Sequence, residues 1–207
     1  MCTVSLIFLQ EKEFILTSNR DEAPGRKTLS PGEELYKGTK LFFPKDEVAG
    51  GTWIGVSEHK RVICLMNGGF EAHQRQEKYK LSRGVVVKDL LAAPNFSEET
   101  GNYDFFGIEP FTIIMVEWDR HLIFSEVVWD GEVLHIKDLP LKNHIWSSSP
   151  LYSSEMKKLR ETWFTELGGK TEISAEDIWD FHHSAGTGDK STDLIMDRGL
   201  IKTKSVT

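Results

Sequence analysis

The chain has 207 residues, a formal net charge of -7 and 39% hydrophobic residues, values typical of a soluble globular protein with one sizeable core. An acidic chain lacks the concentrated basic surface of nucleic-acid binders, so we expect no nucleic-acid partner. The longest apolar stretch near the start, residues 4–9, is too short for a signal segment or a membrane span, so the sequence predicts a cytoplasmic protein.

Two apolar runs open the chain. Thr3–Leu9 and Phe14–Ser18 are rich in β-forming residues and are separated by four polar residues, a pattern that predicts a hairpin. Antiparallel pairing brings the two far ends of a hairpin together. Cys2 and the segment Asn19-Arg20-Asp21-Glu22 should therefore lie side by side.

The next segment, from Ala23 to Gly50, is rich in Pro, Gly and Lys, and only Lys40–Phe43 resembles a strand. We expect a long irregular connection here, of the kind that forms functional loops or lids. A second hairpin is predicted from residues 51–56 and 61–66, and it ends in the turn signal Asn67-Gly68-Gly69. A helix is expected at Ser82–Leu91.

The second half of the chain predicts a three-stranded meander at residues 111–118, 121–129 and 133–138. Two helices should follow, one after an N-cap within Ser153-Ser154 and one opened by a capping box at Ser174. The apolar face of the first helix should comprise Met156, Leu159, Trp163 and Leu167. The tail, residues 200–207, has strand character but no evident partner, so we expect the last C-terminal strands to be absent.

This order of elements predicts one α+β domain over residues 1–207, built from antiparallel sheets. The sequence leaves open whether the protein forms a homo-oligomer.

Cys2 is the candidate nucleophile. Removal of Met1 would leave Cys2 with a free α-amine whose pKa, about 7.7 to 8.0, suits a general base. A cation such as Arg20 would favour the thiolate, and Asp21 could hold the amine as the third member of a triad holds its base. The alternative is that Cys2 is a small buried residue at the start of a strand.

Four motifs resemble the NRDE family, also called the TANGO2 (transport and Golgi organisation) family. They are Met1-Cys2, Asn19-Arg20-Asp21-Glu22, Ala49–Gly55 and the Asn67 turn. This family is similar to the N-terminal nucleophile (Ntn) hydrolases of the choloylglycine hydrolase and penicillin V acylase type. The resemblance implies a four-layer αββα sandwich of antiparallel sheets and cleavage of a non-peptide C–N amide bond through a Cys2 thioester.

The same resemblance implies roles for single residues. Cys2 matches the nucleophile, Asp21 matches the carboxylate that contacts the α-amine, and Asn67 matches an Asn near the oxyanion site. Arg20 is adjacent to Asp21, whereas the hydrolases place their Arg three residues before the Asp. The predicted catalytic residues are Cys2, Arg20, Asp21 and Asn67.

Two positions depart from the hydrolase pattern. Ser148 stands where the hydrolases have a second Asn, and Lys204 replaces the Arg of a Thr-Arg-Ser stretch. Ser and Lys cannot reproduce the donor geometry of an amide or a guanidinium group. An alternative therefore stays open: a non-catalytic binding or trafficking protein on the same scaffold, handling haem or lipid. A third alternative is a redox role for Cys2.

The partner is expected to be a small-molecule substrate or ligand, bound by Asn19, Arg26, Trp53, Ser148 and Lys204. Each also has an ordinary structural interpretation, such as a solvated charge or, for Trp53, a core position. We expect no metal and no cofactor. His182 and His183 diverge by about 100° on a helix, which is unsuitable for one metal, and residues 186–191 lack the residue order of a phosphate loop.

Overall fold

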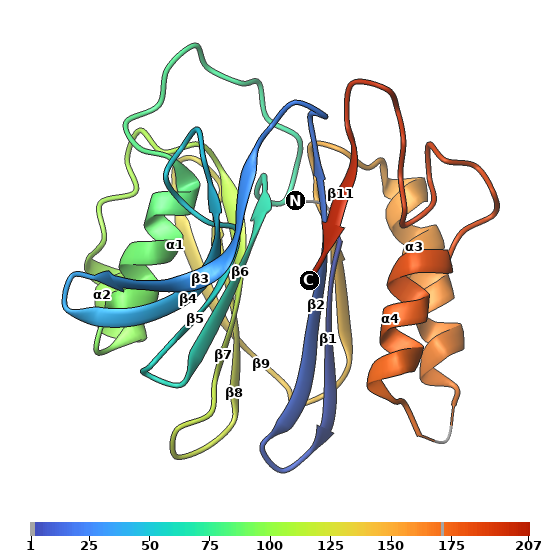
Figure 1. Cartoon of the computed structure of the whole chain (residues 1–207), viewed down its shortest axis with the longest axis horizontal. Helices are drawn as coiled ribbons and strands as arrows, with labels where there is room; N and C mark the ends of the chain where they lie inside the picture. The colour runs from blue at the N-terminus through green and yellow to red at the C-terminus, as the bar shows by residue number, and fades with distance from the viewer. Residues whose placement is uncertain (1–2, 171) are drawn as a thin grey trace. The chain divides into compact units, whose positions relative to one another are not determined.

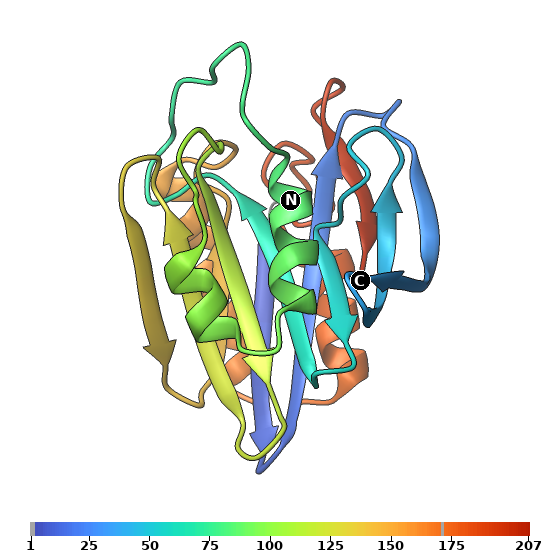
Figure 2. The same cartoon turned by 90° about the vertical axis from the view of Figure 1, so that its left-hand side faces the viewer.

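The computed structural model describes residues 3–170 and 172–207. Contacts between Cα atoms divide the chain into two compact units: unit 1, made of Met1–Gly25 and Leu141–Thr207, and unit 2, Arg26–Pro140. The described residues form an α+β protein with two antiparallel sheets and four helices, coloured along the chain in Figures 1 and 2. That there is one domain remains a prediction.

Unit 1 contains a four-stranded sheet in the order β10-β1-β2-β11. Its strands are β1 (Thr3–Gln10), β2 (Glu13–Glu22), β10 (His144–Ser147) and β11 (Lys202–Val206). Helices α3 (Ser154–Gly168) and α4 (Ala175–Ser184) cover one face of this sheet (Figure 1). The predicted hairpin is confirmed, because β1 pairs with β2 and Thr3 lies opposite Asn19.

Both helices of unit 1 begin where the sequence predicts. The Ser153 side chain accepts a hydrogen bond from the Met156 backbone N–H, and Ser174 forms a capping box with Asp177. The predicted inner face of α3 is partly wrong, because Leu159 is 42% exposed and the buried positions are Arg160 and Phe164. Hydrophobic periodicity counts only apolar residues, so it places the inner face away from the buried arginine.

The tail of unit 1 also departs from expectation. The sequence predicts no partner for it, but β11 pairs with β2 and places Thr203 opposite Asp21. The short strand β10, which pairs with β1, is not predicted because four residues carry too little periodicity to distinguish a strand.

Unit 2 contains a seven-stranded sheet in the order β3-β4-β5-β6-β7-β8-β9. The strands are β3 (Thr28–Tyr36), β4 (Thr39–Asp46), β5 (Ile54–Ser57), β6 (Arg61–Asn67), β7 (Phe111–Glu117), β8 (Ile123–Trp129) and β9 (Leu134–Leu139). Its helices are α1 (Arg83–Ala92) and α2 (Phe96–Asn102). The second hairpin, the meander and α1 are confirmed.

The expected irregular stretch before Gly50 is wrong, because β3 and β4 form a hairpin there. Pro31 argues against a strand in general, but β3 is an edge strand and its register shifts between Leu29 and Gly32. A proline is tolerated at such a position since no ladder hydrogen bond is lost.

Helix α1 packs against β4, β5 and β6 (Figure 2) and supplies buried Val86, Val87, Leu90 and Leu91 to the core of unit 2. The glycines before β5 explain how closely the first turn of α1 can approach the backbone there. Gly50 has a φ of +66°, and a Cβ on Gly51 would lie 2.7 Å from the Cα of Gly84. Thr52 N–H then donates to Gly84 O over 3.1 Å. This part of the Ala49–Gly55 motif therefore serves the docking of α1.

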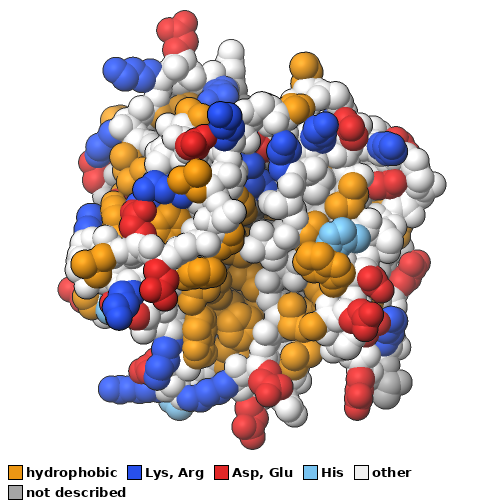
Figure 3. All heavy atoms as spheres, viewed as in Figure 1, with side chains coloured by type: hydrophobic (Ala, Val, Ile, Leu, Met, Phe, Trp, Pro, Cys, Tyr) orange, Lys and Arg blue, Asp and Glu red, His pale blue; other side chains and the backbone are white. Residues whose placement is uncertain are grey.

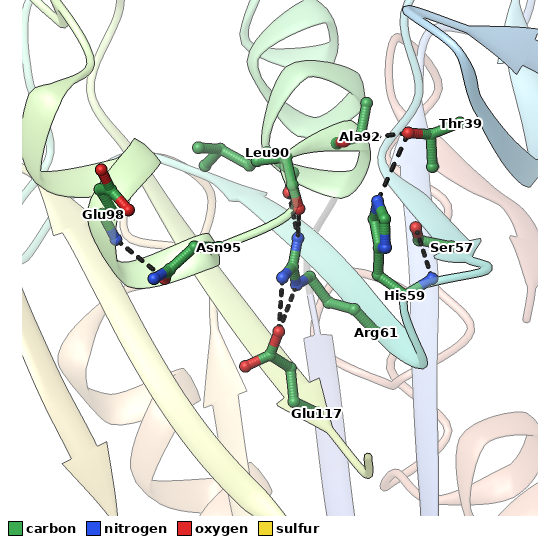
Figure 4. A network of polar contacts seen from close by, with 10 residues as sticks. Thr39, Ser57, His59, Arg61, Leu90, Ala92, Asn95, Glu98 and Glu117 are labelled. Atoms are coloured by element: carbon green, nitrogen blue, oxygen red, sulfur yellow. Dashed lines mark hydrogen bonds and ion pairs between the residues drawn. The ribbon is translucent and has the colours of Figure 1, made fainter.

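Arg61 closes the other end of α1 (Figure 4). Its Nη1 donates to the carbonyls of Leu90 and Ala93, both at 2.7 Å, and its Nε and Nη2 contact the Glu117 carboxylate. A cation at the C-terminal end of a helix satisfies carbonyls that lack helical partners.

On the face drawn in Figure 3, Lys and Arg side chains are interspersed with Asp and Glu. None of the helices in the described part of the chain is long and apolar enough to span a membrane.

Candidate active site

The carboxylate of Asp21 is the centre of a buried polar cluster in unit 1. Asp21 lies near the end of β2 and is 3% exposed. Tyr152 Oη donates to its Oδ2 over 2.6 Å, and Thr203 Oγ1 donates to its Oδ1 over 2.5 Å. Strand pairing places Thr203, and a turn in which Ser148 O accepts from Tyr152 N–H at 3.2 Å places the tyrosine. Both carboxylate oxygens are thereby fixed.

Arg160 of α3 lies behind this cluster. Its guanidinium carbon is 3.6 Å from the centroid of the Tyr152 ring, and its Nη1 donates to Thr3 Oγ1. Nη2 donates to the carbonyls of Thr192 and Asp193, each at 3.0 Å. Arg160 thus contacts the residue that follows Cys2 in the chain as well as the tyrosine that holds Asp21.

A second buried cluster joins β1, β2 and α4. Ser5, Asn19 and His182 are all fully buried. The Asn19 Nδ2 donates to His182 O at 3.0 Å and to Leu194 O at 2.9 Å, which turns its Oδ1 towards His182 Nδ1. His182 Nδ1 is therefore the donor, and its Nε2 accepts from Ser5 Oγ at 2.7 Å.

Burial lowers the pKa of His182 to about 3, with smaller contributions from electrostatic interactions with His183 and Arg160. The imidazole is neutral at physiological pH. The arrangement has the residue order of a nucleophile, a base and an orienting amide, but all three groups are closed off from solvent. This cluster of Ser5, Asn19 and His182 therefore links β1 and β2 to α4.

The structure separates Arg20 from Asp21 on strand β2. Successive side chains of a strand point to opposite faces, so Asn19 and Asp21 share one face while Arg20 and Glu22 share the other. The Arg20 Nη2 lies 3.9 Å from Glu22 Oε2, and the arginine is buried.

The other predicted positions of unit 1 have different environments. Ser148 is buried in the turn that leads to Tyr152, whereas Lys204 is exposed and its Nζ donates to Pro24 O over 2.9 Å. Cys2, the predicted nucleophile, lies outside the described residues.

Three further predicted residues belong to unit 2. Trp53 is buried, and Asn67 ends β6 where the chain turns away towards α1. Arg26 pairs with Asp46 through its Nε at 2.8 Å. Burial opposes ionisation of Asp46, but Arg26 and the N–H groups of Ala49 and Val48 together hold the pKa of this carboxyl below its usual range. Asn67 does not start a tight hairpin turn, because α1 and α2 lie in sequence between β6 and its antiparallel partner β7.

Sequence reasoning misses the residues that support Asp21. Arg160 and Tyr152 carry no motif, and the sequence indicates of His182 only that it is an unsuitable metal ligand. Thr203 is the exception, because it belongs to the stretch Thr203-Lys204-Ser205, which resembles a Thr-Arg-Ser stretch of the hydrolases. His182 and His183 do diverge as predicted, because His183 is exposed and contacts Trp179 O through its Nδ1 at 2.8 Å. Residues 3–170 and 172–207 hold no group of three or more His, Cys, Asp or Glu that could bind a metal.

The chain matches one family model and several solved structures. The family model described as Transport and Golgi organisation 2 (TANGO2) matches residues 1–183. No curated protein matches the chain. Among solved structures, the chain is similar to a Caenorhabditis elegans orthologue of N-acylethanolamine-hydrolyzing acid amidase. The two are 10% identical with a TM-score of 0.63, and the match covers 97% of this chain and 89% of the amidase. This match shows an Ntn-hydrolase-like fold.

Two bacterial structures match less well. A single-residue variant of conjugated bile acid hydrolase from Clostridium perfringens is 10% identical, with a TM-score of 0.49, over 82% of this chain and 58% of that one. Penicillin V acylase from Agrobacterium tumefaciens is 13% identical, with a TM-score of 0.48, over 88% of this chain and 64% of that one. The chain therefore spans less than two thirds of the length of either enzyme.

Proposed function

The chain belongs to the Transport and Golgi organisation 2 (TANGO2) family, and from this premise we propose that it is an N-terminal-nucleophile amidohydrolase acting on a non-peptide C–N bond. The observation that supports this most is the buried Asp21 carboxylate, which Tyr152 and Thr203 fix at both oxygens. It lies two residues along β2 from Asn19, the partner of Thr3, and Thr3 directly follows Cys2.

In the proposed mechanism, removal of Met1 exposes the α-amine of Cys2. The amine takes the thiol proton, and the thiolate attacks the amide carbonyl carbon to give a tetrahedral oxyanion. The ammonium then protonates the leaving amine as the C–N bond breaks, which leaves a thioester. Water, deprotonated by the same amine, hydrolyses the thioester and restores the thiol. Asp21 holds the amine in line throughout.

Two further roles belong to the same proposal. Arg20 favours the thiolate by its charge, and Asn67 stabilises the oxyanion together with backbone N–H groups. The role of Asn67 requires the two sheets to stack as a four-layer αββα sandwich, which is part of the proposal. The substrate class is a small-molecule amide, in keeping with the similarity in fold to an amidase.

Intact mass and a substrate panel test the proposal. The expressed protein should have lost Met1, and it should release amine from at least one member of a panel of N-acyl amides. Cys2→Ala should abolish release, and Cys2→Ser should retain a small fraction of it. Retention of Met1, or turnover unchanged in Cys2→Ala, contradicts the mechanism.

The second candidate function is a non-catalytic haem- or lipid-binding protein on the same scaffold. The exposed position of Lys204 favours it, because this cation contacts Pro24 O instead of the Asp21 cluster. Haem titration followed by the Soret band, together with labelling of Cys2 at neutral pH, separates the two. Tight haem binding with an ordinary, slow thiol would favour the binding protein over the hydrolase.

A further inference from the structure

The two hydroxyls that donate to Asp21 each have this carboxylate as the nearest acceptor among their described contacts. Thr203 Oγ1 accepts from Met196 N–H at 2.9 Å, and its single proton can go to Asp21 at 2.5 Å or to Leu194 O at 3.2 Å. The Tyr152 proton can go to Asp21 at 2.6 Å or to Met196 Sδ at 3.9 Å. In each case the carboxylate is the closer and stronger acceptor. A carboxylate accepts about four hydrogen bonds, so these two do not exhaust it.

The guanidinium of Arg160 ties two parts of this arrangement together. It stacks on the face of the Tyr152 ring, which fixes the plane of the ring and hence the direction of its O–H. The same group binds Thr3 Oγ1, which fixes the first described residue of β1. One side chain thus sets the positions of the Asp21 donor and of the strand that follows Cys2.

Burying the charged guanidinium of Arg160 costs free energy, and packing alone gives no reason for a cation at this position. The residue is 1% exposed, and among the described residues no carboxylate pairs with it. Its Nε is buried without a hydrogen-bond partner in the described structure. A buried cation without an acidic partner is unfavourable. Its position over the Tyr152 ring fits a role in the electrostatics of the cluster around Asp21.

We propose that Tyr152, Thr203 and Arg160 are positioning residues that hold Asp21 against the α-amine of Cys2. This inference rests on the proposed function, and it adds three residues that act through Asp21 and do not touch the substrate themselves. Arg198 provides a matched control, because its guanidinium lies 5.2 Å from the same Tyr152 ring but is exposed.

The test is the rate of Cys2 modification by iodoacetamide as a function of pH in protein lacking Met1, with Cys2 resolved from the buried Cys64 by peptide mapping. Thr203→Val and Tyr152→Phe each remove only a hydroxyl from Asp21. Each should lower the rate at pH 7 roughly three- to tenfold and raise the apparent thiol pKa. Thr203→Ser, which keeps the hydroxyl, should stay within about twofold of the unmodified chain.

Arg160→Met should give the same change in the pH profile, and Arg198→Met should not. If Arg160→Met does not fold, Tyr152→Phe and Thr203→Val decide the matter. The inference is overturned if both leave the pH–rate curve unchanged while Asp21→Asn shifts it. If the apparent pKa of the Cys2 thiol has its ordinary value in the unmodified chain and Asp21→Asn does not change it, the proposed function fails. The positioning roles then fail with it.

Discussion

Each unit contains an arginine that is only 1% exposed, Arg61 on β6 of unit 2 and Arg160 on α3 of unit 1, and the two side chains are held in different ways. In unit 2, Arg61 pairs with Glu117 and satisfies two carbonyls at the end of α1. In unit 1, Arg160 binds two carbonyls, the Thr3 hydroxyl and the face of Tyr152, without an acidic partner among the described residues.

The difference separates a folding role from a positioning role. The hydrogen bonds of Arg61 satisfy the end of a helix or pair its charge with Glu117, and its guanidinium also lies 5.3 Å from the centroid of the Phe96 ring, so the fold alone accounts for it. The contacts that the structure describes for Arg160 leave its charge uncompensated and its Nε without a partner, and they converge on Thr3 and on the tyrosine that holds Asp21. Variants of these residues and of their neighbours test whether the two roles differ.

Among the variants of charged residues, Arg61→Met should have the largest effect on stability. It leaves the carbonyls of Leu90 and Ala93 without a donor and breaks the pair with Glu117, so the free energy of unfolding should fall by about 3 kcal/mol. Urea denaturation measures the loss. Lys60→Met, which breaks the exposed pair with Asp119, should cost about 0.5 kcal/mol or less. Equal losses of unfolding free energy in the two variants would show that Arg61 does not stabilise the end of α1.

His182 should make the protein sensitive to acid. Its folded pKa is lowered to about 3, against about 6.5 when unfolded, so the unfolded state binds more protons between these values. This contribution to stability is complete above pH ~6.5 and is lost as the pH falls, at up to about 1.4 kcal/mol per unit. Denaturation midpoints measured between about pH 6.5 and pH 5 should show the slope.

His182→Gln should flatten that slope, and His183→Gln, at an exposed position, should not. A slope that persists in His182→Gln would mean that another group titrates in this window.

Arg160→Met should lower the free energy of unfolding by about 1 to 2 kcal/mol, which is less than the loss expected for Arg61→Met. The change removes donors from the carbonyls of Thr192 and Asp193 but breaks no described ion pair, and Met has a similar length for packing on Tyr152. Parallel urea denaturation of the two variants gives the comparison. A loss larger than that of Arg61→Met would indicate that Arg160 serves mainly the fold.

Leu159→Gln should have the smallest effect, within about 0.5 kcal/mol, because the side chain is exposed on α3. Phe164→Ala, on the buried face, should cost about 3 kcal/mol. Thermal unfolding of the pair checks the orientation of α3 that places Arg160 inwards. A larger loss in Leu159→Gln than in Phe164→Ala would support the face predicted from apolar periodicity.

Local features are predictable from the sequence because local physics sets them. The first hairpin, the meander and the caps at Ser153 and Ser174 follow from alternation and from side chains that satisfy free N–H groups. The strand β3 escapes prediction for the opposite reason. Its Pro31 is compatible with an edge position that only the completed sheet reveals.

The surroundings of Asp21 cannot be predicted in the same way. Asp21 itself comes from a motif, but Tyr152, Arg160 and Thr203 lie 131 to 182 residues away in sequence from their hydrogen-bond partners on β1 and β2. Pairing between distant strands leaves no local pattern, and a buried arginine is invisible to hydrophobic periodicity. Asn19 illustrates the reverse case, since its motif suggests a ligand contact and its amide is engaged inside unit 1.

The central claim is that Asp21 and the α-amine of Cys2 activate the Cys2 thiol. The most direct test is the pH dependence of iodoacetamide reaction at Cys2 in protein lacking Met1, compared with Asp21→Asn. We predict an apparent thiol pKa below the ordinary value of about 8.5, and a rise in that pKa in Asp21→Asn. An ordinary thiol pKa that Asp21→Asn does not change would contradict the claim.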